Sequence, residues 1–193
     1  MRQITKRLDE LREKMEIPNF FENKGLGNEV GFYIFDYHPS DELVVREAIP
    51  QMKEYLERTQ SRFTIQIFDI YDIILSFFEK RGYMEKNFKM EQKRGSLDWY
   101  EKMQKALKIA TNNDYIVEYI CEHIEEDAIV FIIGIGKAYP IIRSHVILNN
   151  LQAVVEKNPL ILFFPGVYDD GKLKLFGKFE DDHYYRAFKI IEN

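Results

Sequence analysis

The chain has 193 residues, of which 46% are hydrophobic, enough for one sizeable core with little room for a second. Its 32 acidic and 27 basic residues give a net charge of -5, which disfavours autonomous nucleic-acid binding. The single cysteine, Cys121, excludes an internal disulfide, and no apolar segment approaches the roughly 20 residues that span a bilayer. Because the N-terminus is charged and amphipathic, unlike a signal peptide, we expect one cytoplasmic domain over residues 1–193, with no membrane insertion.

The first part of the chain predicts two helices around a strand. Apolar residues recur at helical spacing over residues 2–16, so we expect an amphipathic helix packed on the domain. The apolar run Phe32–Asp36 then predicts a strand, and a second helix follows to about Arg58. Pro50 lies inside that helix, where a missing N–H predicts a kink or a break near Ile49.

The middle of the chain repeats this pattern of a strand followed by helices. Phe63 to Ile67 predicts a second strand, and the helix after Asp69 ends at Gly82. The charged stretch 83–95 is typical of an exposed helix or an ordered excursion. Lys86, Lys89, Lys93 and Arg94 in that stretch are the one local feature that favours DNA contact, within a larger complex.

The segment from Ala128 to Gly166 determines the fold class. Two apolar runs, 128–133 and 159–164, flank the helical pattern 143–157, as in a β-α-β unit with parallel strands. We therefore predict an α/β fold, with a three-layer, mostly parallel sheet flanked by helices. The Asp169-Asp170-Gly171 turn predicts a hairpin, and with the last run, 184–191, it indicates antiparallel strands at the C-terminal edge of the sheet.

The turn Gly134-Ile135-Gly136-Lys137 invites a phosphate-binding interpretation, because glycines between a strand and a helix let backbone amides approach an anion. The match to known motifs fails. A Walker A loop needs glycine where Phe131 stands and Ser or Thr where Ala138 stands, and the third glycine of a dinucleotide fingerprint would fall at Tyr139. Gly134, Gly136 and Lys137 remain candidates for binding a nucleotide or phosphate without hydrolysis; the alternative is a tight turn beside a solvated lysine.

No other group of residues forms a complete catalytic or metal site. Ser144 and His145 are neighbours on a predicted helix, where a nucleophile and its base rarely meet, so we predict no hydrolase and no enzyme. The four histidines show no ligand spacing, and carboxylates at strand ends more often cap helices than hold a cation, so no metal or cofactor is expected. Asn149 and Asn150, both poor helix formers, indicate hydrogen bonds to a neighbouring loop or a ligand.

Several short motifs, in their order along almost the whole chain, resemble the BrxB family of bacteriophage exclusion (BREX) defence systems. They are the segments 25–30 (GLGNEV), 32–37 (FYIFDY), 134–140 (GIGKAYP), 143–145 (RSH), 148–151 (LNNL), 164–166 (FPG) and 184–188 (YYRAF). The resemblance implies a bacterial protein encoded beside a DNA methyltransferase, a large ATPase and PglZ, a protein similar to alkaline phosphatases. It also implies a fold similar to a P-loop-NTPase-like or Rossmann-like domain that lacks a Walker A motif.

The resemblance further implies a non-enzymatic adaptor that binds PglZ and supports assembly of the complex that modifies host DNA and excludes phage. The alternative function is a regulatory domain that binds a nucleotide or phosphate. Ligands and partners of α/β sheets bind beyond the carboxyl ends of the strands. We therefore expect the partner surface at that edge, and its candidate residues are Lys137, Tyr139, Arg143, His145, Asn149, Tyr184, Tyr185 and Arg186.

Overall fold

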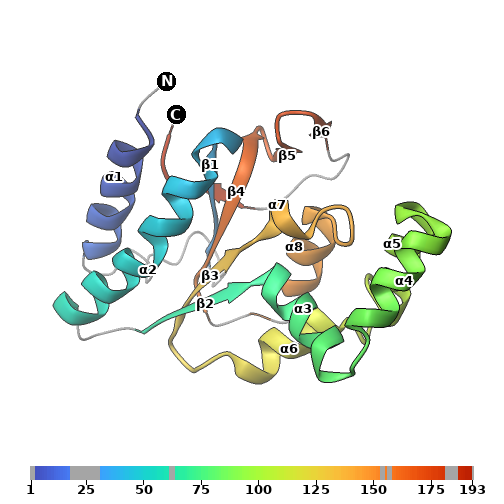
Figure 1. Ribbon diagram of the computed structural model, residues 1–193. Coiled ribbons are helices and arrows are strands. Elements are labelled where there is room, and N and C mark those ends of the chain that lie inside the picture. Colours follow the sequence, from blue (N-terminus) through green and yellow to red (C-terminus); the bar gives the residue numbers. More distant parts are fainter. Residues whose placement is uncertain are drawn as a thin grey trace.

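A mostly parallel sheet runs through the middle of the molecule, which is described by a computed structural model over residues 3–17, 31–60, 64–152, 155, 158–180 and 187–192. Figure 1 shows helices on both sides of this sheet. Its parallel strands follow the order β2-β3-β4-β1-β7. Their bounds are Phe32–Tyr37 (β1), Ile65–Asp69 (β2), Ile129–Ile133 (β3), Leu160–Asp169 (β4) and Phe188–Lys189 (β7).

Each face of the sheet is covered by its own set of helices, because alternate residues of a strand point to opposite faces. Phe35, Phe131 and Phe163 pack against α1 (Ile4–Glu16) and α2 (Glu42–Thr59). On the other face, Ile34, Ile132 and Leu162 pack against several helices. These are α3 (Ile70–Lys80), α6 (Tyr115–His123) and α8 (Ser144–Gln152). The prediction of a three-layer α/β fold is confirmed.

Helix α1 packs on the sheet as its apolar spacing predicts, with Leu8, Leu11 and Met15 buried. Helix α2 follows the short 3-10 turn Pro39–Asp41 and runs through Pro50 without a break, so of the kink or break expected near Ile49 the break is wrong. Pro50 is exposed, so the carbonyl of Arg46, which loses its donor there, lies on the solvent side where water can solvate it. None of the described helices combines the length and the apolar character needed to cross a membrane.

Antiparallel strands follow β4, as expected. The outer half of β4 pairs with β5 (Lys172–Leu175) across the Asp170-Gly171 turn, and β5 pairs with β6 (Phe179–Glu180). The prediction for the last run was wrong in direction, because β7 pairs in parallel with the free edge of β1. An Asp-Gly turn sets the direction only of the two strands that it joins, so it carried no information about β7.

A helical hairpin, α4 (Met84–Arg94) and α5 (Ser96–Ala106), is inserted in the crossover between β2 and β3. The stretch 83–95, predicted as an exposed helix or an excursion, is therefore helical. In Figure 1 both helices lie to the side of the molecule, away from the sheet. The single turn α7 (Ile135–Ala138) follows β3 directly and lies at the carboxyl edge of the sheet.

Candidate functional site

A buried ion-pair network lies at the end of β1, on the carboxyl edge of the sheet. Asp36 is 1% exposed, and its carboxylate accepts hydrogen bonds from Arg7 Nη2 on α1 and from the backbone N–H of Tyr168 on β4, both at 3.0 Å. Lys189 Nζ on β7 lies 3.0 Å from the second carboxylate oxygen. Arg7 also donates to the backbone carbonyls of Asp36 and Ile191. The network therefore joins a helix and three strands, and it serves stability.

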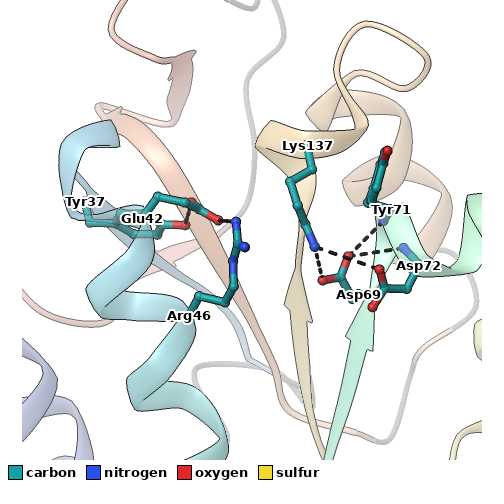
Figure 2. Close-up of polar contacts among 7 residues, drawn as sticks. All are labelled: Tyr37, Glu42, Arg46, Asp69, Tyr71, Asp72 and Lys137. Atoms are coloured by element: carbon teal, nitrogen blue, oxygen red, sulfur yellow. Dashed lines mark hydrogen bonds and ion pairs between the residues drawn. The ribbon is translucent and has the colours of Figure 1, made fainter.

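A second polar cluster anchors the entrance to α2, as Figure 2 shows. The Tyr37 hydroxyl donates a hydrogen bond of 2.6 Å to Glu42 Oε2, and Arg46 lies 3.6 Å from the other oxygen of that carboxylate. Burial, together with the hydrogen bond to Glu42, raises the pKa of Tyr37 well above its usual range. Tyr37 therefore stays a neutral donor, and the Glu42 charge is satisfied locally.

The third cluster contains the predicted phosphate turn, at the ends of β2 and β3. Asp69 caps α3, with its Oδ1 accepting from the N–H groups of Tyr71 and Asp72 at 3.0 and 3.3 Å. Its other oxygen accepts from Lys137 Nζ at 2.5 Å (Figure 2). Gly134 has a φ of 80°, and a Cβ there would collide with Asp69 Oδ1. The carboxylate of Asp69 therefore already lies against this turn.

These contacts favour the structural interpretation of the glycine turn. An anion that used Lys137 would have to displace a carboxylate that also caps a helix. The second glycine, Gly136, faces Pro165 and the ring of Phe176, and a Cβ at Gly136 would lie only 2.9 and 3.0 Å from their carbons. Pro165 and the Phe176 ring therefore leave no room for a side chain at Gly136.

We accordingly expect nucleotides to leave the melting temperature unchanged. A ligand with a Kd of about 0.1 mM, present at about 1 mM, would stabilise the native state by about 1.4 kcal/mol. In a chain of this length that corresponds to a rise of about 3–6 °C in Tm. Titration with ATP, GTP and cyclic nucleotides in a thermal-shift assay measures this directly, and a rise that K137A abolishes would show that the turn binds a ligand.

A cleft of about 300 Å³ opens between the α7–α8 connection and the β5–β6 hairpin. Two predicted residues, Tyr139 and Arg143, line it together with Lys178 and Phe179. The rings of Tyr139 and Phe179 lie 4.8 Å apart, and Phe179 is 47% exposed. Within the described part of the chain, neither Arg143 nor Lys178 has an ion-pair partner. The cleft therefore combines aromatic walls, two cations without an ion-pair partner among the described residues, and the carboxylate of Glu180, which is paired with Lys172 and Lys174.

Of the other predicted partner residues, the two whose side chains the structure describes, Lys137 and Asn149, do not line this cleft. Lys137 is engaged with Asp69, and Asn149 is exposed on α8. Its neighbour Asn150 donates to Asp114 Oδ2 at 3.4 Å, which agrees with a hydrogen bond to a neighbouring loop. The side chain of His145 and the segment that contains Tyr184, Tyr185 and Arg186 lie outside the described residues.

Lys178 and Phe179, which line the cleft, and the neighbouring Phe176 were not predicted from the sequence. The rings of Phe176 and Phe179 lie 6.4 Å apart, and both contact Tyr139, so the three aromatic residues form one cluster. The sequence feature that could have indicated them is a pair of phenylalanines on either side of Gly177, just after the predicted hairpin. Phe179 is exposed, so burial in the core cannot account for it, and an exposed aromatic residue at a turn is a candidate for a surface role. Phe176 is partly buried against the core.

The side chains that could act as nucleophiles are poorly placed for chemistry. Burial and the neighbouring Glu122 raise the pKa of the Cys121 thiol, which lowers its thiolate fraction at neutral pH. Ser144 is buried at the start of α8. Among the residues that the structure describes, no three His, Cys, Asp or Glu side chains converge in a way that could hold a metal ion.

Comparison with known proteins decides the family. The family model described as "BREX protein BrxB" matches residues 66–190. The chain belongs to the BrxB family. A BrxB protein of Bacillus cereus (strain H3081.97) is 50% identical over 192 residues, which cover the full length of both chains. A BrxB protein of Escherichia coli O9:H4 (strain HS) is 32% identical over 187 residues, covering 96% of this chain and 90% of the relative. No solved structure matches the chain.

Membership of the BrxB family confirms the resemblance drawn from the short motifs and places the chain in a BREX phage-defence system. As a BREX component, this BrxB protein works with other BREX proteins. The family match includes β2 to β7, and therefore both sides of the cleft and the inserted helices α4 and α5.

Proposed function

We propose that this chain is a non-enzymatic adaptor of its BREX system, which binds PglZ through the cleft of Tyr139, Arg143, Lys178 and Phe179. The observation that carries the proposal is that two cations without an ion-pair partner among the described residues, Arg143 and Lys178, line the same cleft as Tyr139 and the exposed ring of Phe179. Arg and aromatic residues are the types that most often anchor protein interfaces. The matching surface on PglZ would present carboxylates beside an apolar side chain that enters the cleft.

Three features of the chain support an adaptor rather than an enzyme. Asp36 and Asp69, at the ends of β1 and β2, and Glu42, at the start of α2, are each held in ion pairs, so none is poised as a general base. The Cys121 thiol has a raised pKa. The occupied glycine turn also weighs against the alternative of a nucleotide-binding domain. We place the protein in the cytoplasm, where the host DNA and the proposed partners are.

The test is the affinity of purified PglZ for variants of the cleft, measured by isothermal titration calorimetry. R143E is expected to weaken binding about 10–100-fold, since a reversed charge at an interface anchor costs about 1.4–2.8 kcal/mol. F179A is expected to weaken it about 10-fold. The controls are R58E, in the last turn of α2, and F188A, on β7, which change the same residue types outside the cleft.

Two results would contradict the proposal. If wild-type protein does not bind PglZ, the adaptor role toward this partner is wrong. If R143E and F179A bind as well as R58E and F188A, while circular dichroism shows all four folded, PglZ uses another surface. Turnover of a phosphate ester or a nucleotide by the purified protein would overturn the non-enzymatic assignment.

A further inference from the structure

The helical hairpin α4–α5 forms an arm that is only partly integrated into the core. Its helices pack mainly against each other, and each has one buried residue, Asn87 on α4 and Met103 on α5. The base of the arm is fixed by burial of Met103 and Leu107 and by a hydrogen bond of 3.2 Å from Gln104 to the carbonyl of Pro140. Because its base is held, the arm can present its outer surface in a defined direction.

Large apolar side chains are exposed along this arm. Leu97, at the start of α5, is 82% exposed, and Phe88, on α4, is 57% exposed. Tyr83, which immediately precedes α4, is 40% exposed. Single exposed apolar residues are common on protein surfaces, but three large ones lie on this one protruding hairpin. The fold gives these three side chains no role in the core.

The charge of the arm differs in sign from that of the chain. Residues 84–106 include six basic and four acidic residues, whereas the whole chain has a net charge of -5. Lys86, Lys89 and Lys93 are spaced three and four residues apart, so they share one face of α4. Among the described residues, the one ion pair of this stripe joins Lys89 and Glu85 at 3.8 Å, and both side chains are highly exposed, so it neutralises little of the charge.

We propose that this arm is a second docking surface, occupied by an acidic protein surface on another subunit of the same BREX assembly. The lysine stripe supplies charge complementarity to such a partner. Phe88, on a different face of α4 from the lysines, and Leu97 on α5 supply apolar anchors for a partner that contacts more than one side of the arm. A DNA partner would contact the lysines through its phosphates but would not bury the apolar side chains, so we favour a protein partner over DNA. The inference goes beyond the PglZ site, since it gives the adaptor a surface for a second partner.

The experiment measures binding of each purified BREX protein of the same system, one at a time, to wild-type protein and matched variants. K86E/K93E reverses the stripe and F88S/L97S removes the apolar anchors; K6E/R58E is the control with the same change in charge, on α1 and α2. For one BREX protein with an acidic surface, the affinity for each of the two arm variants should be at least 10-fold lower than the affinity for wild-type protein. The control and R143E should bind it like wild type.

Salt provides an independent readout. Affinity for the second partner should fall as ionic strength rises, and K86E/K93E should flatten that dependence. The inference is overturned if every BREX protein binds the arm variants as well as wild type, or if PglZ is the protein whose binding the arm variants weaken. It is also overturned if those variants instead abolish binding of a 20-base-pair DNA duplex. It is likewise overturned if sedimentation shows that the arm joins two copies of this chain.

Discussion

Replacing Asp36 with alanine is expected to lower the free energy of unfolding by about 3–5 kcal/mol, the cost of removing one partner from a buried ion pair. The substitution leaves Arg7 buried without its carboxylate and removes the acceptor for Lys189 and for the N–H of Tyr168. In a chain of this length, that loss corresponds to a drop of about 6–20 °C in Tm. Chemical denaturation with urea measures the free energy directly.

Asp9→Ala is the matched control for this experiment. Asp9 lies on the same helix as Arg7, but its ion pair with Arg12, at 3.4 Å, is on the surface, so D9A should change stability by less than about 0.5 kcal/mol. If D36A does not fold, D36N gives the comparison with the shape of the side chain retained. A D36A protein as stable as D9A would show that the network contributes nothing to the fold.

Replacing Gly134 with alanine is expected to lower the free energy of unfolding by about 2–5 kcal/mol. Its positive φ disfavours any residue with a Cβ by roughly 1–2 kcal/mol. The new methyl group would also meet Asp69 Oδ1, and overpacking at such a contact costs about 1–3 kcal/mol. Movement of Asp69 would weaken both the cap of α3 and the ion pair to Lys137.

Gly82 offers the control that separates these two costs. It also has a positive φ, of 65°, but nothing lies within 4 Å of the position where its Cβ would be. G82A should therefore cost only the backbone part, roughly 1–2 kcal/mol. Thermal and urea denaturation of both variants give the difference, and equal losses in G134A and G82A would mean that Asp69 moves away at no cost.

The fold class was predictable because buried parallel strands have a simple pattern. The apolar runs at 128–133 and 159–164, with a helix between them, are found as β3, α8 and β4. The order of the strands across the sheet was not predictable, because nothing in the local pattern says that β4 lies between β3 and β1. For the same reason, the parallel pairing of β7 with β1 could not be predicted from the sequence.

The candidate site was partly predictable for a related reason. Tyr139 and Arg143 could be named as candidates because they come after β3, at the carboxyl edge of the sheet, and both line the cleft. The engagement of Lys137 could not be predicted, since its partner Asp69 is 68 residues earlier in the chain and meets it only because β2 and β3 are neighbours. Phe179 likewise reaches Tyr139 only after the hairpin has folded back.

The pairing of β1 also has a consequence for how the protein is made. Phe32 in β1 pairs with Leu160 in β4, and the other edge of β1 receives β7, still later in the chain. At about 5–20 residues per second, a ribosome takes on the order of 10 s to reach β4 after β1. During that time β1 has neither neighbour of its final sheet, whereas β2 and β3 need less of the chain to meet. A nascent chain thus carries an apolar strand with two open edges, which is a natural binding site for a chaperone.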